Sequence, residues 1–306
     1  MLYSLSDANL LIEGWVRRLC RRRTRLPESM LRILRTRIAS IQPLPRTTDP
    51  SLQAWQNNVE ELRYRILNDD PSRFLRWPVV RRTMFVGSTP FVREELRALR
   101  AQPNWSSRWK AAVIEDALGH PPGLARFRAT SGNRVHHAYH LMQFERMANC
   151  RISDLDCIFE FGGGYGGMAR LVHKLGFRGR YVILDLEAFS ALQSTYLAET
   201  LRNAHTDVHC VSDPEAVLPL LIGGDRLLLA TWSLSEVPSS VRERMHPLIG
   251  ACSHFLIGYQ LQFEELNNER IAQEIERVAP AGTGWQDIEI SHLSGNRYLI
   301  GAPRPA

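Results

Sequence analysis

The sequence contains no apolar run close to the roughly 20 residues that a helix needs to cross a bilayer. We therefore expect no integral membrane segment. A cleavable secretion signal is not expected either, because the short apolar piece at residues 9–12 precedes the basic cluster instead of following it. The absence of both segments favours the cytoplasm.

Cysteine pairs at metal-binding spacing are also missing. The five cysteines are odd in number and scattered along the chain: Cys20, Cys150, Cys157, Cys210 and Cys252. None stands in a CxxC pair, so the sequence suggests neither a zinc knuckle nor a disulfide framework. We interpret these cysteines as free thiols in a reducing compartment.

Positive charge is concentrated at the start of the chain. Of the formal net charge of +6, residues 1–46 contribute ten arginines against three acids, a net +7, which leaves −1 for the remaining residues. Lysine is nearly absent, with only Lys110 and Lys174, which we attribute to the codon bias of a GC-rich genome. A nearly neutral remainder argues against an extended nucleic-acid groove there.

The N-terminal half has a helical pattern. Residues 1–42 predict a basic arm of two helices broken near Pro27, with an apolar stripe at Val16, Leu19, Leu31, Leu34 and Ile38. Prolines at residues 43–50 mark a linker. Residues 50–149 predict short helices separated at Pro71, Pro78, Pro90, Pro103 and the pair at 121–122. Within this N-terminal region, residues 1–150, we expect the helices of residues 50–149 to act as a lid and as part of a dimer contact.

The pattern changes at residue 151. Short apolar runs at 157–161, 181–184, 208–211, 227–230 and 255–259 alternate with helix-compatible segments, which predicts a mostly parallel, doubly wound α/β sheet. The last two runs, 288–293 and 297–301, flank a Ser-Gly-Asn turn and predict an antiparallel hairpin. Such a seven-stranded, Rossmann-like sheet is typical of methyltransferases rather than dehydrogenases. We expect residues 151–306 to form the catalytic domain.

A glycine loop joins the first predicted strand to its helix. Gly162 and Gly164 permit a tight turn and a close backbone approach to a ligand that a Cβ atom would obstruct. With Gly167 they also satisfy the dinucleotide fingerprint GxGxxG, which on its own is a weak signal.

Two acids near this loop favour one ligand. Glu160, at the end of the first strand, can bind the ammonium of a methionine moiety but would repel a pyrophosphate. Asp185, at the end of the second strand, can accept hydrogen bonds from both ribose hydroxyls. We therefore predict S-adenosyl-L-methionine as cofactor, with S-adenosyl-L-homocysteine as product, and count Gly163 and Leu186 among its contacts. NAD and a purely structural turn are the alternatives.

Three further residues follow the third and fourth strands. Asp213 could contact the adenine amino group, or it could cap the helix that begins at Pro214. Ser233 and Glu236 could line the cofactor or acceptor site, because ligands bind at the carboxyl ends of parallel strands. Capping of the helix after Pro238 explains them as an alternative.

These motifs resemble the bacterial sugar O-methyltransferase family over residues 50–301. The resemblance rests on EFGGGYGGMAR (160–170), DLEAFSALQ (185–193) and SLSE (233–236), and upstream on ILNDDP (66–71), FLRW (74–77) and VHHAYH (135–140). Downstream it includes Trp285, HL (292–293) and NRYLIG (296–301). It implies an S-adenosylmethionine-dependent fold and a sugar hydroxyl as acceptor. Glu187 stands where the family is expected to have proline, which bears on the start of the helix.

Methyl transfer to a hydroxyl requires that the enzyme align the hydroxyl oxygen with the methyl group and remove the hydroxyl proton. Histidine is the favoured base near neutral pH. We rank His292 first, because it lies in the C-terminal hairpin, and then His137 or His140. Glu236 could orient the base or bind a metal. His136 and His140 are spaced as a metal half-site, but no matching carboxylate motif accompanies them, so no metal is predicted although a divalent ion is possible.

We expect a cytoplasmic O-methyltransferase that acts on a sugar-containing small molecule. We expect no nucleic-acid partner, and a homodimer or higher oligomer formed through the N-terminal helices; an anionic membrane face is a less favoured partner for the arm. The alternatives are a methyltransferase for a non-sugar natural product or peptide, a non-catalytic partner protein that keeps the fold, and a dehydrogenase.

Overall fold

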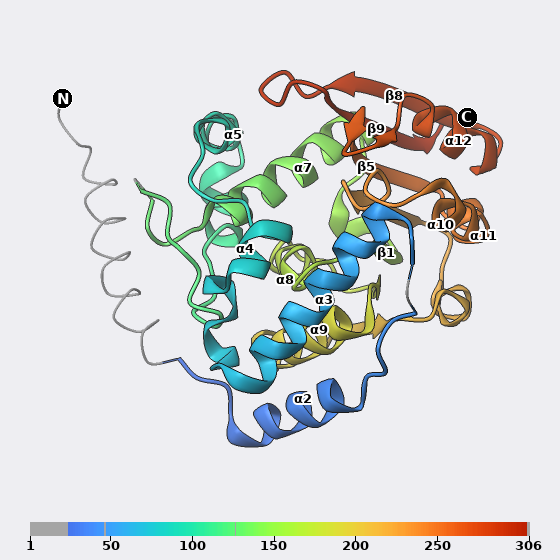
Figure 1. Cartoon of the computed structure of the whole chain (residues 1–306). Helices are drawn as coiled ribbons and strands as arrows, with labels where there is room; N and C mark the ends of the chain where they lie inside the picture. The colour runs from blue at the N-terminus through green and yellow to red at the C-terminus, as the bar shows by residue number, and fades with distance from the viewer. Residues whose placement is uncertain (1–23, 46, 126, 305–306) are drawn as a thin grey trace.

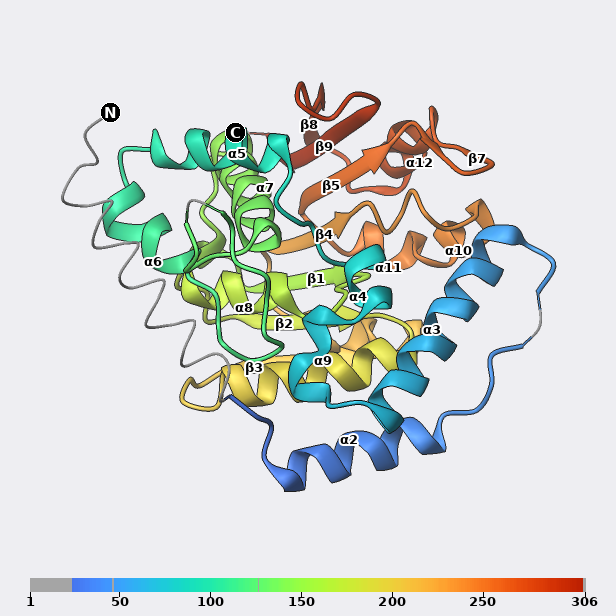
Figure 2. The same cartoon turned by 60° about the vertical axis from the view of Figure 1, so that its left-hand side comes forward.

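The structure, a computed structural model, describes residues 24–45, 47–125 and 127–304 (Figure 1). Its centre is a seven-stranded sheet in the order β3-β2-β1-β4-β5-β9-β8, which can be followed in Figure 2. The strands are β1 (Cys157–Phe161), β2 (Arg180–Leu184), β3 (Asp207–Val211), β4 (Arg226–Thr231), β5 (His254–Gln260), β8 (Thr283–Glu289) and β9 (Asn296–Pro303). A separate small hairpin pairs β6 (Gln262–Phe263) with β7 (Leu266–Asn267).

The sheet is doubly wound. β1 to β5 pair in parallel, whereas β9 pairs antiparallel with both β5 and β8. Alternate residues of each strand enter different cores: Ile158 joins the core on one face of the sheet and Phe159 the core on the other. This arrangement confirms the predicted Rossmann-like seven-stranded methyltransferase sheet that ends in an antiparallel hairpin.

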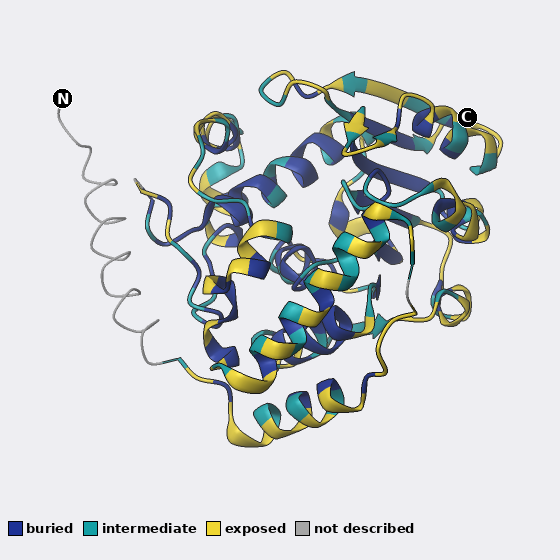
Figure 3. Cartoon of the chain, viewed as in Figure 1, coloured by how far each residue is buried: buried dark blue, intermediate teal, exposed yellow. Residues whose placement is uncertain are grey.

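Helices cover both faces. One core receives α2 (Glu28–Ser40), α3 (Pro50–Asn68), α4 (Pro78–Thr83), α5 (Pro90–Arg100), α6 (Lys110–Ala112), α7 (Gly132–Ala148), α8 (Gly167–Lys174) and α9 (Glu187–Thr200). The other receives α11 (His246–Gly250) and α12 (Ile271–Val278), and α10 (Ser239–Arg244) contacts α11. Short 3₁₀ turns lie at Pro71–Arg76, Ile152–Asp154, Pro214–Ala216 and Leu218–Leu220, and a π turn at Trp105–Trp109. Figure 3 shows α8 buried at the centre and the outer face of α2 exposed.

The predicted helical N-terminal region is confirmed, and prolines begin its helices as expected. Pro50 starts α3, where Asp49 accepts a hydrogen bond from the amide of Leu52, and Pro90 starts α5 after the cap Thr89. The core that these helices share with α8 and α9 continues across residue 150, the predicted domain boundary.

The basic arm is described only from residue 24, so Val16 and Leu19 lie outside the described residues. Its second helix, α2, begins after Pro27 as predicted. Leu34 and Ile38 are buried against the same chain, where α2 packs on α3 and α9 (Figures 1 and 2). This part of the apolar stripe is therefore not a free surface for a second subunit.

The C-terminal hairpin is present, but its first strand was misplaced. We predicted residues 288–293, whereas β8 runs from Thr283 to Glu289 and the loop begins at Ile290. β8 is the edge strand and its side chains are largely exposed or half-buried, so it has no apolar run to reveal it. The apolar Ile290 and Leu293 instead anchor the loop, with Leu293 packed against the core.

Candidate functional site

A cavity of about 650 Å³ opens at the carboxyl ends of the central strands. Segments from both halves of the chain line it. They include the loop after β1, the turn after β2, the loop after β4, α3 and α7, the connection from α4 to α5, and the hairpin loop. No helix in the described part of the chain is long and apolar enough to span a membrane.

The glycine loop forms one wall of the cavity. Gly162 and Gly164 have φ values of 73° and 58°, which L side chains rarely adopt. A Cβ atom on Gly162 would lie 2.5 Å from Cβ of Ser233, and one on Gly164 would lie 3.0 Å from Cβ of Met84. Glycine is thus required both by the backbone conformation and by the space that the neighbouring chain leaves.

Glu160 lies at the floor of the cavity and is buried. Burial raises its pKa to about 8, although the hydroxyl of Tyr181 donates a hydrogen bond to Oε2 across 2.8 Å and opposes the shift. The nearby carboxyl of Asp185 also raises this pKa. The site therefore favours a cationic ligand group that would compensate the charge of Glu160.

Asp185 joins the turn after β2 to the glycine loop. Oδ2 accepts hydrogen bonds from the amide of Gly164 at 3.0 Å and from Nε2 of Gln193 at 2.7 Å, and Oδ1 accepts from the amide of Leu186 at 2.8 Å. Desolvation nevertheless raises the pKa of Asp185 to about 7. Gln193 also donates to the carbonyl of Gly164 at 2.9 Å, so this buried α9 side chain, to which no role was predicted, fixes loop and acid together.

Most of the predicted cofactor residues meet in this cavity. Its lining includes Glu160, Gly162, Gly163, Gly164, Asp185, Leu186 and Ser233. Asp213 is placed differently: Ser212 and Pro214 line the cavity, but the exposed side chain of Asp213 accepts a hydrogen bond from the amide of Glu215. The alternative helix-capping interpretation accounts for this side chain.

The predicted catalytic residues are divided between two places. His137 and Glu236 line the cavity, whereas His140 and His292 do not. Burial raises the pKa of Glu236 to about 7, and it depresses the pKa values of His137 and His140 well below the ordinary range.

His292 and His140 instead belong to a buried polar cluster beside the cavity. Oε1 of Glu95, on α5, accepts hydrogen bonds from Nδ1 of His136 at 2.7 Å and Nε2 of His292 at 2.9 Å. Nδ1 of His140 is hydrogen-bonded to the hydroxyl of Tyr298. His136 lines the cavity, and the sequence had suggested for it only a metal half-site. Glu95 lies 41 residues before it, so no local spacing indicates this pairing.

Trp232 connects this cluster to the cofactor end of the cavity. It has a φ of 69°, unusual for a bulky residue, and its ring stacks on His136 with centroids 5.2 Å apart. Its Nε1 donates to Oδ1 of Asn296 at 2.6 Å. The next residue, Ser233, donates a hydrogen bond to the carbonyl of Phe161 at the start of the glycine loop.

The wall opposite the sheet comes from the helical region. Leu52 and Trp55 on α3 and Met84 after α4 line the cavity, and Trp55 contacts the ring of Phe189 edge-on with centroids 6.1 Å apart. The sequence predicted that this region forms a lid, but it did not identify the residues that line the cavity. Helical periodicity does not show which side chains face a distant loop.

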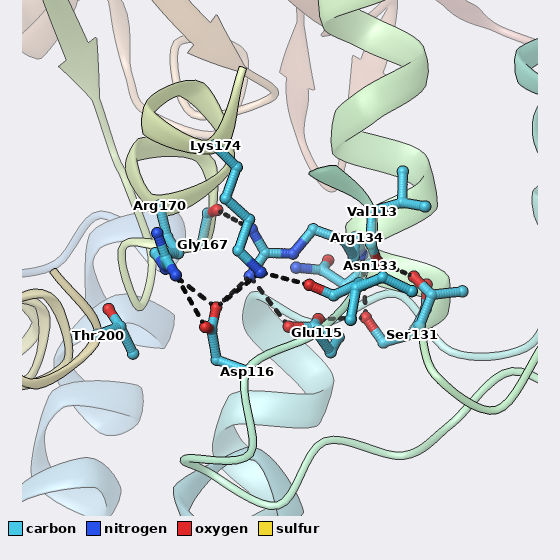
Figure 4. Close-up of polar contacts among 12 residues, drawn as sticks. Val113, Glu115, Asp116, Ser131, Asn133, Arg134, Gly167, Arg170, Lys174 and Thr200 are labelled. Carbon is cyan, nitrogen blue, oxygen red and sulfur yellow. Dashed lines mark hydrogen bonds and ion pairs between the residues drawn. The ribbon is translucent and has the colours of Figure 1, made fainter. Parts of the chain in front are cut away.

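A buried ion network contacts the helix that follows the glycine loop (Figure 4). Arg134 on α7 is fully buried, pairs with Glu115 at 3.0 Å and donates to the carbonyl of Gly167 at 3.2 Å, at the first residue of α8. Asp116 extends the network to Arg170 and Lys174, both on α8. The helix that follows the glycine loop is therefore held by charge-assisted contacts from α7 and from the segment before it.

Within the residues that the structure describes, no three His, Cys, Asp or Glu side chains are grouped so that they could hold a metal ion. The polar side chains of the site lie at the glycine loop and in the polar cluster beside the cavity, which contains Glu95, His136, His140, His292 and Tyr298.

No model of a known protein family matches the sequence, and no curated protein matches it. Several solved structures do. PhzM, a pyocyanin biosynthetic protein, shares 12% identity at a TM-score of 0.39; the match covers 68% of this chain and 61% of PhzM. The 16S rRNA methyltransferase RmtF, in complex with S-adenosyl-L-homocysteine, shares 11% identity at a TM-score of 0.40 over 95% of this chain and 98% of RmtF.

The magnesium protoporphyrin IX methyltransferase ChlM from Synechocystis PCC 6803, with bound cofactor, shares 13% identity at a TM-score of 0.38, over 73% of this chain and 89% of ChlM. Because these TM-scores lie below 0.5, the fold assignment rests on the strand order of the sheet itself.

Proposed function

We propose that the protein is an S-adenosyl-L-methionine-dependent O-methyltransferase that methylates a hydroxyl of a sugar or a glycosylated small molecule. One observation carries the proposal: the glycine loop, Glu160 and Asp185 line the same cavity as His136 and His137. This shared lining supports a cofactor site and a proton acceptor in one cavity.

The residues present fit this cofactor. Gly162 and Gly164 leave a cradle that Cβ atoms would fill, and Glu160 and Asp185 line the same cavity. In this proposal the carboxylate of Glu160 binds the ammonium group, and Asp185 accepts hydrogen bonds from the ribose hydroxyls. When bound, S-adenosylmethionine would supply an electrophilic methyl group on a positively charged sulfur. The protein must then align the acceptor oxygen with that methyl group and accept the hydroxyl proton.

A sugar-containing acceptor is supported by the sequence resemblance and by the composition of the cavity. The lining includes the aromatic rings of Phe91 and Trp232 and the amides of Asn133 and Asn296. Apolar surfaces with a few hydrogen-bonding groups suit a hydroxylated ring. Arg244 also lines the cavity, so an acceptor with a phosphate group belongs among the compounds to test.

The activity is tested with labelled S-adenosylmethionine and a panel of nucleotide sugars, oligosaccharides, glycosylated metabolites, hydroxylated natural products and peptides. Label in a sugar-containing product is the expected result. Label found only in a natural product or a peptide would show that the acceptor is of that class and not a sugar-containing compound. Calorimetry with S-adenosylhomocysteine separates an enzyme from a non-catalytic partner protein, because failure to bind at micromolar levels would overturn the proposal.

We further propose a cytoplasmic location and a homodimer or higher oligomer formed through the N-terminal helices. The location is supported by the cysteines, which are unpaired at all four positions in the described residues. With Leu34 and Ile38 covered by the same chain, a dimer contact made by the basic arm would use the outer face of α2, where Ile33 is exposed, or residues 1–23. Light scattering on the full chain and on a chain without residues 1–23 tests this; equal mass would exclude these residues from the contact.

A further inference from the structure

The polar cluster beside the cavity has one member that differs from the other histidines. His136 lines the cavity, its Nδ1 is hydrogen-bonded to Glu95, and its Nε2 makes no hydrogen bond with the described part of the chain. An imidazole whose Nδ1 donates to a carboxylate has Nε2 free as a proton acceptor. This tautomer is what a general base for a hydroxyl requires.

The competing histidines lack one or both of these features. His137 lines the cavity, but its Nδ1 is buried without a hydrogen-bond partner, and burial together with the charge of Arg134 keeps its pKa low. His140 does not line the cavity, and its Nε2 is buried without a partner. His292 has its Nε2 occupied by Glu95. His136 alone among these four combines cavity access with a carboxylate partner.

Two aromatic rings also hold the position of His136. Trp232 stacks on it at 5.2 Å, with an interplanar angle of 24°, and Phe91 packs at 5.5 Å. Because Trp232 is followed directly by Ser233, which contacts the glycine loop, the ring lies next to the cofactor end of the cavity.

From this geometry we infer that His136 is the general base of the reaction and that Glu95 is the positioning residue that orients it and stabilises its protonated form. The inference rests on the proposed methyltransferase function and identifies the proton acceptor that the sequence left open. His136 therefore replaces His292 as the first choice for the general base. His292 becomes a second donor to Glu95, which ties the hairpin loop to α5.

In the methyl transfer, Nε2 of His136 takes the proton of the acceptor hydroxyl while the hydroxyl oxygen forms its bond to the methyl carbon. The carbon–sulfur bond breaks, and its electron pair stays on sulfur. The carboxylate of Glu95 faces the imidazolium across the Nδ1 hydrogen bond, and His136 returns its proton to water after the product leaves.

The first test uses the free protein and needs no acceptor. Histidine ring resonances are followed by NMR from pH 4 to 9 in the wild type and in Glu95→Gln. The groups facing His136 are Glu95 from α5, His292 from the hairpin loop, and His137 and His140 from α7. Only the first is a carboxylate, so the ring-nitrogen shifts of the neutral His136 should show the proton on Nδ1 in the wild type, and this preference should weaken in Glu95→Gln. A proton on Nε2 in the wild type would overturn the inference.

The second test measures single-turnover methyl transfer to the acceptor found in the panel. His136→Gln should lower the rate by about 10²- to 10⁴-fold, the usual contribution of a general base, with S-adenosylhomocysteine affinity within about threefold. Glu95→Gln should lower the plateau rate and move the acidic limb of the pH profile to lower pH, and Glu95→Asp should recover part of the rate. His209→Gln, on the edge strand β3, is the matched control and should retain the wild-type rate.

A wild-type rate in His136→Gln, or loss of the pH-dependent limb only in Glu236→Gln, would assign the base to another residue. Failure of the proposed function looks different: the wild type would neither bind S-adenosylhomocysteine nor transfer a methyl group, while the NMR titration would still report on the pair of Glu95 and His136.

Discussion

The amide of Gly164 donates a hydrogen bond to Oδ2 of Asp185 across 3.0 Å. The two residues belong to the turns that follow neighbouring parallel strands, β1 and β2, and lie 21 positions apart in the chain. The acid proposed to bind the ribose thus also sets the conformation of the loop proposed to contact the rest of the cofactor. A change at either position should affect the other.

Replacing Asp185 by Ala should therefore weaken the binding of S-adenosylhomocysteine. The loss of hydrogen bonds to a charged group costs about 1.5–3 kcal/mol, or roughly ten- to a hundredfold in affinity. Calorimetry on the folded variant measures it. Asp213→Ala removes a nearby exposed acid that does not line the cavity, and it should bind within about twofold of the wild type. Equal affinities for Asp185→Ala and the wild type would show that the ribose is held elsewhere.

Replacing Gly164 by Val should reduce affinity further. A branched Cβ is strained at a φ of 58°, and it would be placed 3.0 Å from Cβ of Met84, where the loop approaches the helical wall. Gly224→Ala is the matched control, because nothing lies within 4 Å of the added Cβ. We expect the control to bind and melt like the wild type, whereas normal binding by Gly164→Val would refute the proposed cradle.

The cofactor end of the site could be predicted from the sequence because its signals are local. A strand, a glycine loop and an acid at the next strand end lie within residues 157–185, and their contacts follow from the parallel pairing of β1 with β2. Gln193 was missed although it lies only 8 positions after Asp185. Its amide contacts the loop only because α9 turns back over it, and no spacing rule indicates that direction.

The acceptor end could not be predicted in the same way. Glu95, His136 and His292 come from α5, α7 and the hairpin loop, and only the tertiary fold brings them together. The sequence favoured His292 for its place near the hairpin, but packing turned its Nε2 onto Glu95. Edge strand β8 was misplaced for a related reason, since its half-exposed side chains give no apolar run.

The stability of the free protein should depend on pH through Glu160. Its pKa of about 8 in the folded state lies above the ordinary value of 4.5, so the folded state binds the proton more tightly. The stabilisation from this group is full below pH 4.5 and is lost as pH rises through 8. Thermal melts at pH 6 and pH 8.5 should show a smaller loss of stability in Glu160→Gln than in the wild type. Equal losses would mean that Glu160 does not titrate in this range.

Cofactor binding should show the opposite pH dependence. A cationic ammonium group favours ionised Glu160, so binding must release its proton. The affinity of the wild type for S-adenosylmethionine should therefore rise between pH 5.5 and 7, by up to about tenfold per pH unit, while the ligand's amino group stays protonated. Calorimetry in buffers of different ionisation enthalpy counts the protons released. Glu160→Gln should bind more weakly, and its affinity should change less with pH. The same pH dependence in both proteins would show that Glu160 does not bind the ammonium group.

The ion network at the helix that follows the glycine loop leads to a prediction about stability. Arg134→Met leaves Glu115 buried with its hydrogen bond from Ser131 but without its cation. Breaking a buried pair from one side costs about 3–5 kcal/mol. The double variant Arg134→Met with Glu115→Gln should recover much of this loss, because no uncompensated charge remains, while Asp116 keeps Arg170 and Lys174 as partners.

Denaturant unfolding of the two single variants and the double variant measures the coupling. Arg202→Ala removes an exposed arginine that pairs with Glu199 one helical turn away, and it should cost less than about 1 kcal/mol. Additive losses in the double variant would show that Arg134 stabilises the fold through its bond to the carbonyl of Gly167 rather than through its charge. In that case the single variant should also bind S-adenosylhomocysteine more weakly, because the start of α8 and the glycine loop would move together.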